Sequence, residues 1–506
     1  MRIMVVIQKR GSYFVTHVTP VLELDRNPPG VAPDDSEVTT RSLAAANDAP
    51  PTDSPQQKDP SLYEVHADGT LCLLFEVCDP PPAMNDYRLK PKTRRDFLKL
   101  TGITVVALGM AETCVAMNMN ELVSDQGLSS RVPSRDSQTI TLFLCGDVMT
   151  GRGIDQVLPH PGDPRIYESY MTSAQGYVKL AEEVSGPIPK PVDFSYIWGD
   201  ALQELRRSNP DVRIINLETA VTTSSEFWGG KGINYRMHPA NIPCITAANI
   251  DCCVLANNHV LDWGYAGLTE TLTTLAGANL KAAGAGRNLL EAEAPAIIEV
   301  AGKGRIIVFG FGDESSGIPW QWRARNDRPG VNLLPNLSET AVGRIAEHIS
   351  RLKRDGDWVV ASIHWGGNWG YEVSSTQREF AHRLIDLAHV DVVHGHSSHH
   401  PKGIEVYKDK PILYGCGDFL NDYEGIQGYE EFRDDLTLMY FVTMDVATGK
   451  LTGLNMTPMQ IRRFRLNYAH PHDVRWLQAV LDRECRVLGA TVELVDECRL
   501  ALAVRR

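Results

Sequence analysis

Five hydrophobic runs of strand length, far apart in the chain, each end in side chains that bind metal ions in many proteins. These ends lie in residues 144–149, 214–218, 256–259, 361–366 and 393–400. Strands that carry Asp, Asn, Glu and His side chains to one edge of a sheet are how α/β proteins form two-metal hydrolytic centres. We therefore expect the five ends to converge, and this expectation constrains the fold more than any other feature.

Apolar runs alternate with stretches of helical periodicity from Thr139 onwards. The expected strands are residues 140–145, 212–216, 252–255, 306–311, 358–363, 390–393, 412–414 and 436–444. The expected helices are residues 194–208, 264–276, 337–354 and 375–388. This alternation predicts a layered α/β domain, and strands without polar positions predict sheets that are covered on both faces.

Six side chains at the strand ends form the candidate metal centre. They are Asp147, Glu218, Asn258, His364, His396 and His399. Carboxylate, amide and imidazole ligands suit one or two divalent ions such as Mn, Zn or Fe. Such ions activate water and stabilise the charge of a phosphoryl or acyl transition state. The sequence therefore predicts hydrolytic chemistry at this centre.

Residues 394–400 contain four histidines, more than packing alone explains. We favour His396 and His399 as metal ligands, with His394 as the alternative and His400 outside the ligand shell. The remaining polar side chains of these segments are candidates for substrate contacts. These are Asn216, Asn257, His394 and His400.

Three further side chains are candidates for catalysis. His259 directly follows Asn258, so it could protonate a leaving group beside the metal, and Asp262 could orient its imidazole. Arg152 closes the loop after the first strand and either clamps an anionic group of the substrate or forms a structural ion pair. The sequence leaves these two roles of Arg152 open.

The 506-residue chain has 50 basic and 63 acidic residues, which gives a net charge of −13. This acidic balance argues against a nucleic-acid partner. The length allows one large domain, which we place at residues 138–468, followed by a helix–strand cap at residues 469–506. We expect this cap to serve packing.

The first part of the chain contains an export signal in an unusual position. Residues 91–116 contain Arg94-Arg95-Asp96-Phe97-Leu98-Lys99, then a short apolar stretch and small residues, which predicts a twin-arginine signal. Residues 1–25 and 61–90 contain strand-like runs, and residues 26–61 read as a disordered linker. We expect a translation start at Met84 and export, after cytoplasmic folding, to the periplasm or cell envelope.

The ordered motifs resemble the capsule biosynthesis CapA family, which is associated with bacterial poly-γ-glutamate synthesis and related to calcineurin-like metallophosphoesterases. The matching residues are 146–149 (Gly-Asp-Val-Met), 216–219 (Asn-Leu-Glu-Thr), 256–264, 364–366 (His-Trp-Gly), 395–399 and 403–419. The resemblance covers residues 138–468. It implies a four-layer α/β/β/α sandwich of the metallophosphoesterase type, with the site at the strand ends.

The chain departs from these relatives at three places. Metallophosphoesterases begin with Asp-x-His, whereas Met149 stands two residues after Asp147 here. Their Gly-Asp-x-x-Asp block is replaced by Asn216-Leu217-Glu218, and Val260 follows His259 where they have an acidic residue. Where the CapA family usually has Ser-Leu-Gly-Asn-Phe, residues 415–419 read Gly-Cys-Gly-Asp-Phe.

The resemblance and the ligand set together favour an exported metal-dependent hydrolase that acts on an anionic envelope polymer or its linkage. Membrane proteins of capsule synthesis are the expected partners. The alternatives are a non-catalytic component that binds the polymer during export and a metal-dependent phosphoesterase.

Overall fold

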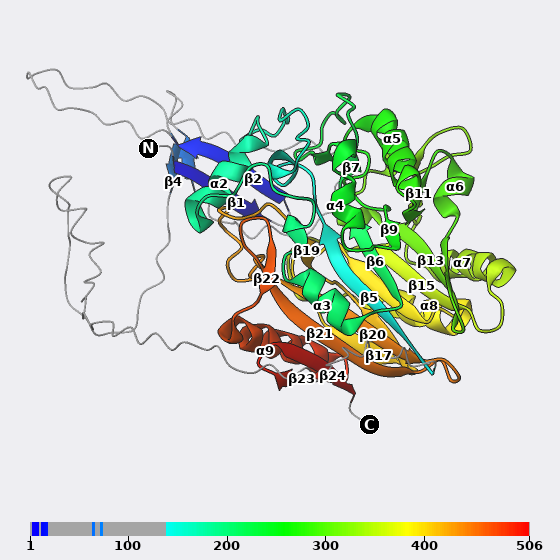
Figure 1. Cartoon of the computed structure of the whole chain (residues 1–506). Helices are drawn as coiled ribbons and strands as arrows, with labels where there is room; N and C mark the ends of the chain where they lie inside the picture. Colours follow the sequence, from blue (N-terminus) through cyan, green and yellow to red (C-terminus); the bar gives the residue numbers. More distant parts are fainter. Residues whose placement is uncertain (1–2, 10–11, 19–62, 66–70, 74–137, 505–506) are drawn as a thin grey trace, which may run out of the picture. The chain divides into compact units, whose positions relative to one another are not determined.

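The computed structural model describes residues 3–9, 12–18, 63–65, 71–73 and 138–504 (Figure 1). The chain forms two compact units, residues 1–125 and 126–506, and each is described by itself. In the first unit, β1 (Ile3–Lys9) pairs antiparallel with β2 (Ser12–Val18), and β3 (Tyr63–Val65) with β4 (Leu71–Leu73). The linker predicted at residues 26–61 and the twin-arginine segment predicted at residues 91–116 lie outside the described residues.

The larger unit contains a ten-stranded mixed sheet, in which β10, β9, β6 and β5 are parallel neighbours and β20 pairs antiparallel with β5. Its strands follow the order β10 (Lys281–Ala283), β9 (Cys252–Val254), β6 (Val212–Leu217), β5 (Thr139–Val148), β20 (Leu436–Asp445), β21 (Leu451–Ile461), β24 (Arg499–Val504) and β23 (Ala490–Asp496). Two short strands pair beside this row, β19 (Asp418–Leu420) with β5 and β22 (Leu466–Tyr468) with β21.

A second sheet has six strands, and its central strands are parallel. Their order is β12 (Ala296–Val300), β13 (Gly304–Gly312), β15 (Trp358–His364), β16 (Val392–His396), β18 (Lys410–Leu413) and β17 (Ile404–Tyr407). Six of the eight strands expected from the apolar runs begin and end within two residues of their expected positions. The other two, β5 and β16, end three residues later, at Val148 and His396.

The two sheets pack face to face and helices cover both outer faces. One core cluster joins Leu142 and Leu144 of the first sheet to Val308 and Val360 of the second, so the sheets share a hydrophobic layer. Helices α3 (Ala201–Ser208), α4 (Pro243–Thr246) and α5 (Gly264–Gly277) contribute to the core on the outer face of the first sheet. Helices α7 (Glu339–Leu352) and α8 (Ser375–Ala388) do so on the second (Figure 1). The predicted four-layer α/β/β/α arrangement is confirmed.

Strand β5 shows why the sequence produces these layers. Leu142 and Leu144 face the second sheet, whereas Phe143 and Cys145 belong to the core under the helices. A strand that is buried on both faces needs apolar residues at every position, because successive side chains point to opposite faces. The apolar runs read from the sequence are therefore the central strands of the two sheets.

The prediction of a single helix at residues 194–208 is confirmed for its second half, α3, and is wrong for its first half. A 3₁₀ turn, η2 (Tyr196–Trp198), precedes α3, and Gly199 separates them with a φ of 44°. A Cβ at Gly199 would lie 2.1 Å from the carbonyl oxygen of Leu466, so the chain passes too close to β22 for any larger residue. Tertiary contact therefore overrides the helical periodicity of this stretch.

The remaining elements lie in the connections between these strands and helices or near the end of the chain. They are η1 (Asp155–Val157), α2 (Gln175–Ser185), β7 (Ala220–Val221), β8 (Arg236–Met237), η3 (Pro239–Asn241), β11 (Ala285–Gly286), α6 (Leu289–Glu293), η4 (Glu314–Ser316), η5 (Trp320–Trp322), β14 (Gly330–Val331) and α9 (Pro471–Val487). The C-terminal hairpin extends the first sheet, because β24 pairs with β21.

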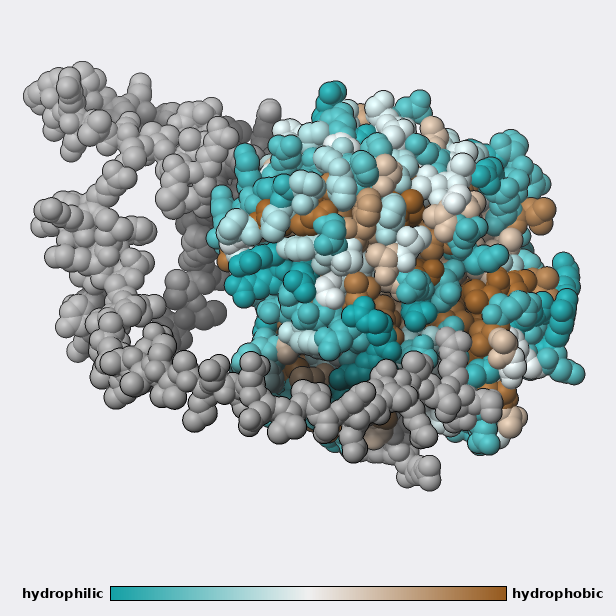
Figure 2. Space-filling model, viewed as in Figure 1, coloured by the Kyte–Doolittle hydropathy of each residue, from teal (hydrophilic) through white to brown (hydrophobic). Residues whose placement is uncertain are grey.

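Figure 2 shows hydrophobic residues in patches between hydrophilic ones on the face in view. Among the described residues, no helix has the length and apolar character that a membrane span requires.

Candidate metal centre

The strand ends expected to converge do meet, at the edge where the parallel strands of both sheets finish. Asp147 of β5 is the register partner of Asn216 on β6 and of Asp418 on β19. In the second sheet, His364 at the end of β15 is the partner of His396 at the end of β16. Parallel register thus places ligand-type side chains from two sheets in one buried group.

Asp147, His364 and His396 form a first cluster, with ligand atoms that all lie within 4.8 Å of one another. The Nδ1 atoms of His364 and His396 are 2.8 Å apart, and His396 Nδ1 is 3.8 Å from Asp147 Oδ1. Asn258 places its Oδ1 3.1 Å from His364 Nε2. Glu218 lies on the same side, with Oε1 3.8 Å from His364 Nε2. The structure therefore brings five of the six predicted ligands together here.

Asp147 also belongs to a second cluster, with His399 and Asp418. His399 Nδ1 lies 2.7 Å from Asp418 Oδ1, and Asn421 donates to the other oxygen of Asp418. His399 is the sixth predicted ligand. Asp418 is not among the six ligands expected from the sequence, although it stands where the CapA motif usually has Asn. That departure was the signal that could have identified it.

The centre concentrates buried negative charge. Asp147, Glu218 and Asp418 are each at most 1% exposed. Burial, followed by the charge of Asp418, raises the pKa of Asp147 to about 7. Burial and the charges of Asp147 and Asp418 raise the pKa of Glu218 well above its ordinary value. Buried carboxylates need a compensating cation, so a divalent ion fits this group.

The imidazoles of the first cluster suit the same ion. Burial lowers the pKa of both His364 and His396 well below the usual value, so both rings are neutral near pH 7. Neutral imidazole is the form that binds metal. Mixed oxygen and nitrogen donors are typical of Zn, Mn and Fe sites, and these residues therefore fit a divalent metal.

His259 lies beside this centre in a small charged network. Its Nε2 is 3.8 Å from Glu218 Oε1, and its Nδ1 is 2.6 Å from Asp262 Oδ2, so Asp262 is placed to orient the ring as predicted. Lys231 places its Nζ 2.9 Å from the same Nδ1 and 2.7 Å from Asp262 Oδ1. Burial, followed by the charge of Lys231, lowers the pKa of His259 to about 4.

Lys231 was missed in the sequence because it lies in the long loop at residues 222–240, which has no periodic pattern. Its side chain is only 14% exposed and it is the basic residue in contact with His259. Nothing in this stretch of the sequence distinguishes this lysine from one that is exposed to solvent.

Arg152 does not face the two clusters. Its guanidinium pairs with Asp422 and Glu168, and the ring of Tyr177 lies 3.6 Å from its Cζ atom. The arginine is 2% exposed and its charge is compensated within the protein. This geometry matches the structural ion pair, the second of the two roles that the sequence left open, rather than an anion clamp.

The four predicted substrate contacts are engaged mainly by the protein itself. Asn216 donates to Asp147, and Asn257 donates to Asn216 and to the carbonyl oxygen of Leu217. His394 and His400 are fully buried, and the His400 ring packs against Tyr371, Trp369 and Phe432. These side chains therefore support the centre from behind rather than line an open surface.

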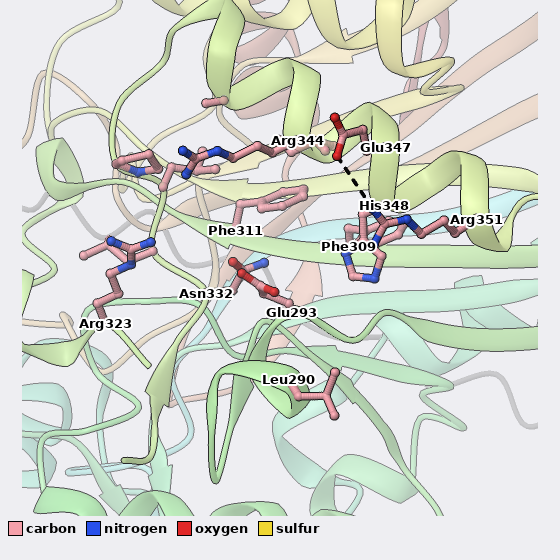
Figure 3. A pocket seen from close by; sticks show the side chains of 15 residues that line it. Leu290, Glu293, Phe309, Phe311, Arg323, Asn332, Arg344, Glu347, His348 and Arg351 are labelled. Carbon is pink, nitrogen blue, oxygen red and sulfur yellow. Dashed lines mark ion pairs between the residues drawn. The ribbon is translucent and has the colours of Figure 1, made fainter. Parts of the chain in front are cut away.

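A separate cavity of about 350 Å³ lies between α6, β13 and α7, with Arg323, Arg344 and Arg351 at its edge (Figure 3). Phe309 and Phe311 form its apolar floor. None of the candidate metal, catalytic or substrate residues lines this cavity. The chemistry of the chain is therefore placed at the strand ends and not here.

The chain is similar in sequence to proteins of bacterial capsule synthesis. The sequence profile of the family described as "Bacterial capsule synthesis protein PGA_cap" matches residues 141–423. A Mycobacterium tuberculosis protein named "Probable polyglutamine synthesis accessory protein" is 50% identical over 354 residues, which cover 70% of this chain and 93% of the relative. The "PGA biosynthesis protein CapA" of Bacillus subtilis is 27% identical over 331 residues, or 65% of this chain and 74% of that protein.

Among solved structures, a phosphatase of Mycoplasma pneumoniae aligns with a TM-score of 0.36 and 13% sequence identity. The alignment covers 64% of this chain and 94% of the phosphatase.

Proposed function

The chain belongs to the bacterial capsule synthesis protein PGA_cap family, and we propose that it is a metal-dependent hydrolase of capsule polymer metabolism. Its substrate is an anionic polymer of the poly-γ-glutamate type, or the linkage that joins this polymer to other groups. The name of the Bacillus subtilis relative, a PGA biosynthesis protein, supports this polymer class, whereas the name of the Mycobacterium relative refers to polyglutamine.

One observation carries the proposal: Asp147 is shared by two buried ligand clusters at the end of β5. A carboxylate between two such groups suits a pair of divalent ions with one bridging ligand. Asp147, Asn258, His364 and His396 would hold one ion, and Asp147, His399 and Asp418 the other. Mn, Zn or Fe fit these donors.

Divalent ions bound by these residues would supply Lewis acidity and an activated water at neutral pH. The protein side chains would transfer the proton that the leaving group needs. His259 is placed by Asp262 and Lys231 with its Nε2 directed at the centre, where it transfers a proton to the leaving group. Because the His259 ring is neutral near pH 7, this proton comes from Glu218, whose pKa is raised and whose Oε1 lies 3.8 Å from that nitrogen.

We also propose that the protein is exported by the twin-arginine route and acts at the cell envelope with membrane proteins of capsule synthesis. The Arg94-Arg95 motif supports this route, which carries folded proteins and therefore suits a preformed metal centre. Replacement of both arginines by lysine should retain the protein in the cytoplasm, whereas unchanged export would contradict the route.

The activity is tested with the full chain loaded with Mn²⁺, Zn²⁺ or Fe²⁺ in turn. The substrates are a γ-glutamyl oligomer and a chromogenic phosphodiester, each measured with and without a chelator. Metal-dependent cleavage of the oligomer, lost in His259→Ala, supports the proposal. Cleavage of the phosphodiester alone would make the protein a phosphoesterase, and polymer binding without any turnover would make it a carrier.

A further inference from the structure

A chain of hydrogen bonds runs behind the first cluster from one sheet to the other. Ser362, His364, His394 and His396 lie on the face of the second sheet that packs against the first, because they alternate with the residues of the outer core. Ser362 is the register partner of His394, and His364 that of His396. The strand pairing therefore places a serine and a histidine directly behind the two metal-type imidazoles.

The direction of each hydrogen bond follows from the first acceptor. His394 Nε2 lies 2.8 Å from the carbonyl oxygen of Cys145, and a carbonyl can only accept, so Nε2 of His394 carries the proton. His394 is fully buried, and its hydrogen-bond partners among the described residues are this carbonyl and the Ser362 hydroxyl. With no charged partner the ring is neutral, which leaves Nδ1 as an acceptor.

The Ser362 hydroxyl links His394 to His396, a candidate ligand of the first cluster. Ser362 Oγ lies 3.0 Å from His394 Nδ1 and 2.9 Å from His396 Nε2. The single hydroxyl proton is donated to His394, so the Ser362 oxygen must accept from Nε2 of His396. The proton of the neutral His396 ring then sits on Nε2, and Nδ1 carries the free lone pair that faces His364 and Asp147.

We propose that Ser362 and His394 are positioning residues that fix His396 in the tautomer able to bind the metal through Nδ1. The inference rests on the proposed metal centre, and it assigns to His394 a role different from substrate contact. The groups that hydrogen-bond to the other ring nitrogen of a ligand histidine set its tautomer and ring orientation. Their loss typically weakens metal affinity by roughly 10–100-fold.

The first test needs no variant. In the metal-free full chain, labelled at the histidine rings with ¹⁵N and ¹³C, the His396 resonances should show the tautomer protonated at Nε2. The His396→Gln variant assigns these resonances. A His396 ring protonated at Nδ1 would overturn the proposal, because that ring could not bind metal at the cluster without rearrangement.

The second test is Ser362→Ala, which removes the hydroxyl and leaves both rings without this partner. We expect Mn²⁺ affinity to fall about 10–100-fold and the His396 ring to lose its single tautomer. Thr457→Val is the matched control, since it removes a buried hydroxyl that contacts Glu204 away from the centre. It should leave Mn²⁺ affinity and the His396 tautomer unchanged.

The outcomes separate this inference from the proposed function. If the unmodified protein binds no divalent ion, the metal centre fails, whereas the tautomer measurement still judges the hydrogen-bond chain. If the unmodified protein binds Mn²⁺ and Ser362→Ala binds it equally well with the same tautomer, the positioning role is wrong and the metal centre stands. If Ser362→Ala does not fold, as judged by circular dichroism, the tautomer of the unmodified protein decides.

Discussion

Asp147 and Asp418 are register partners on the adjacent parallel strands β5 and β19, so two buried carboxylates end side by side at one edge of the first sheet. The backbone holds them there, since the Asp147 amide donates to the carbonyl oxygen of Gly417, 2.9 Å away. A Cβ at Gly146 would lie 1.6 Å from that oxygen, which explains the glycine before Asp147. Two negative charges that lie side by side repel each other, which favours a cation between or beside them.

Asp418→Asn tests whether this second carboxylate contributes to a second metal position. The amide keeps the shape and an oxygen donor but removes the charge, so the cluster with His399 should bind its ion much more weakly while the cluster with His364 keeps one. Native mass spectrometry of the Mn²⁺-loaded protein should show one ion fewer than in the unmodified chain. An unchanged metal count in Asp418→Asn would mean that Asp418 is not needed for binding.

Metal affinity should depend on pH through the carboxylates rather than the imidazoles. His364 and His396 have lowered pKa values and are already neutral, whereas the pKa of Asp147 is raised to about 7. Protons therefore compete with the ion below pH 7, and Mn²⁺ affinity should fall about tenfold per pH unit for each proton displaced. Calorimetric titration between pH 5.5 and 8 measures this, and an affinity that is constant down to pH 5.5 would contradict it.

His259→Ala should abolish turnover and leave metal content unchanged, because this ring faces Glu218 and belongs to neither ligand cluster. Lys231→Met should raise the pKa of His259, since the lysine charge is a cause of its depression. The two effects are read by steady-state kinetics and by NMR titration of the ring. Loss of metal in His259→Ala would make His259 a ligand instead of an acid.

Arg152→Met should destabilise the fold by about 3–5 kcal/mol, because it leaves Asp422 and Glu168 buried without their cation. Arg351→Met is the control, since its pair with Glu347 is about three-quarters exposed and should contribute less than about 1 kcal/mol. Urea unfolding measures both variants. A stable Arg152→Met protein with weakened polymer binding would instead favour the anion clamp.

Much of the fold could be predicted from the sequence because its central strands are buried on both faces. Continuous apolar runs such as residues 358–363 identify these strands, and the alternation with helices identifies the layers. The helix expected at residues 194–208 failed because the contact between Gly199 and Leu466 joins residues far apart in the chain. Local periodicity carries no information about such a contact.

The candidate centre was predictable where a ligand lies at or next to the last residue of a strand, as Asp147, His364 and His396 do. Spacing alone could not separate His394 from His396, because both lie on one face of the same strand. Their contacts in the structure separate them, because His396 lies beside Asp147 and His364, whereas His394 contacts the carbonyl oxygen of Cys145 on the opposite sheet. Lys231 could not be predicted for a similar reason. It lies in a loop, and only its contact with His259 in the structure shows that it belongs to the site.

The central claim, that Asp147, His364 and His396 hold a divalent ion, is tested most directly by the metal content of the purified full chain and of His396→Ala. After loading with Mn²⁺ or Zn²⁺ and dialysis, elemental analysis should find bound metal in the unmodified protein and a clear loss in the folded variant. A folded, unmodified protein that retains no divalent ion, or a His396→Ala variant that retains as much as the unmodified protein, would contradict the account.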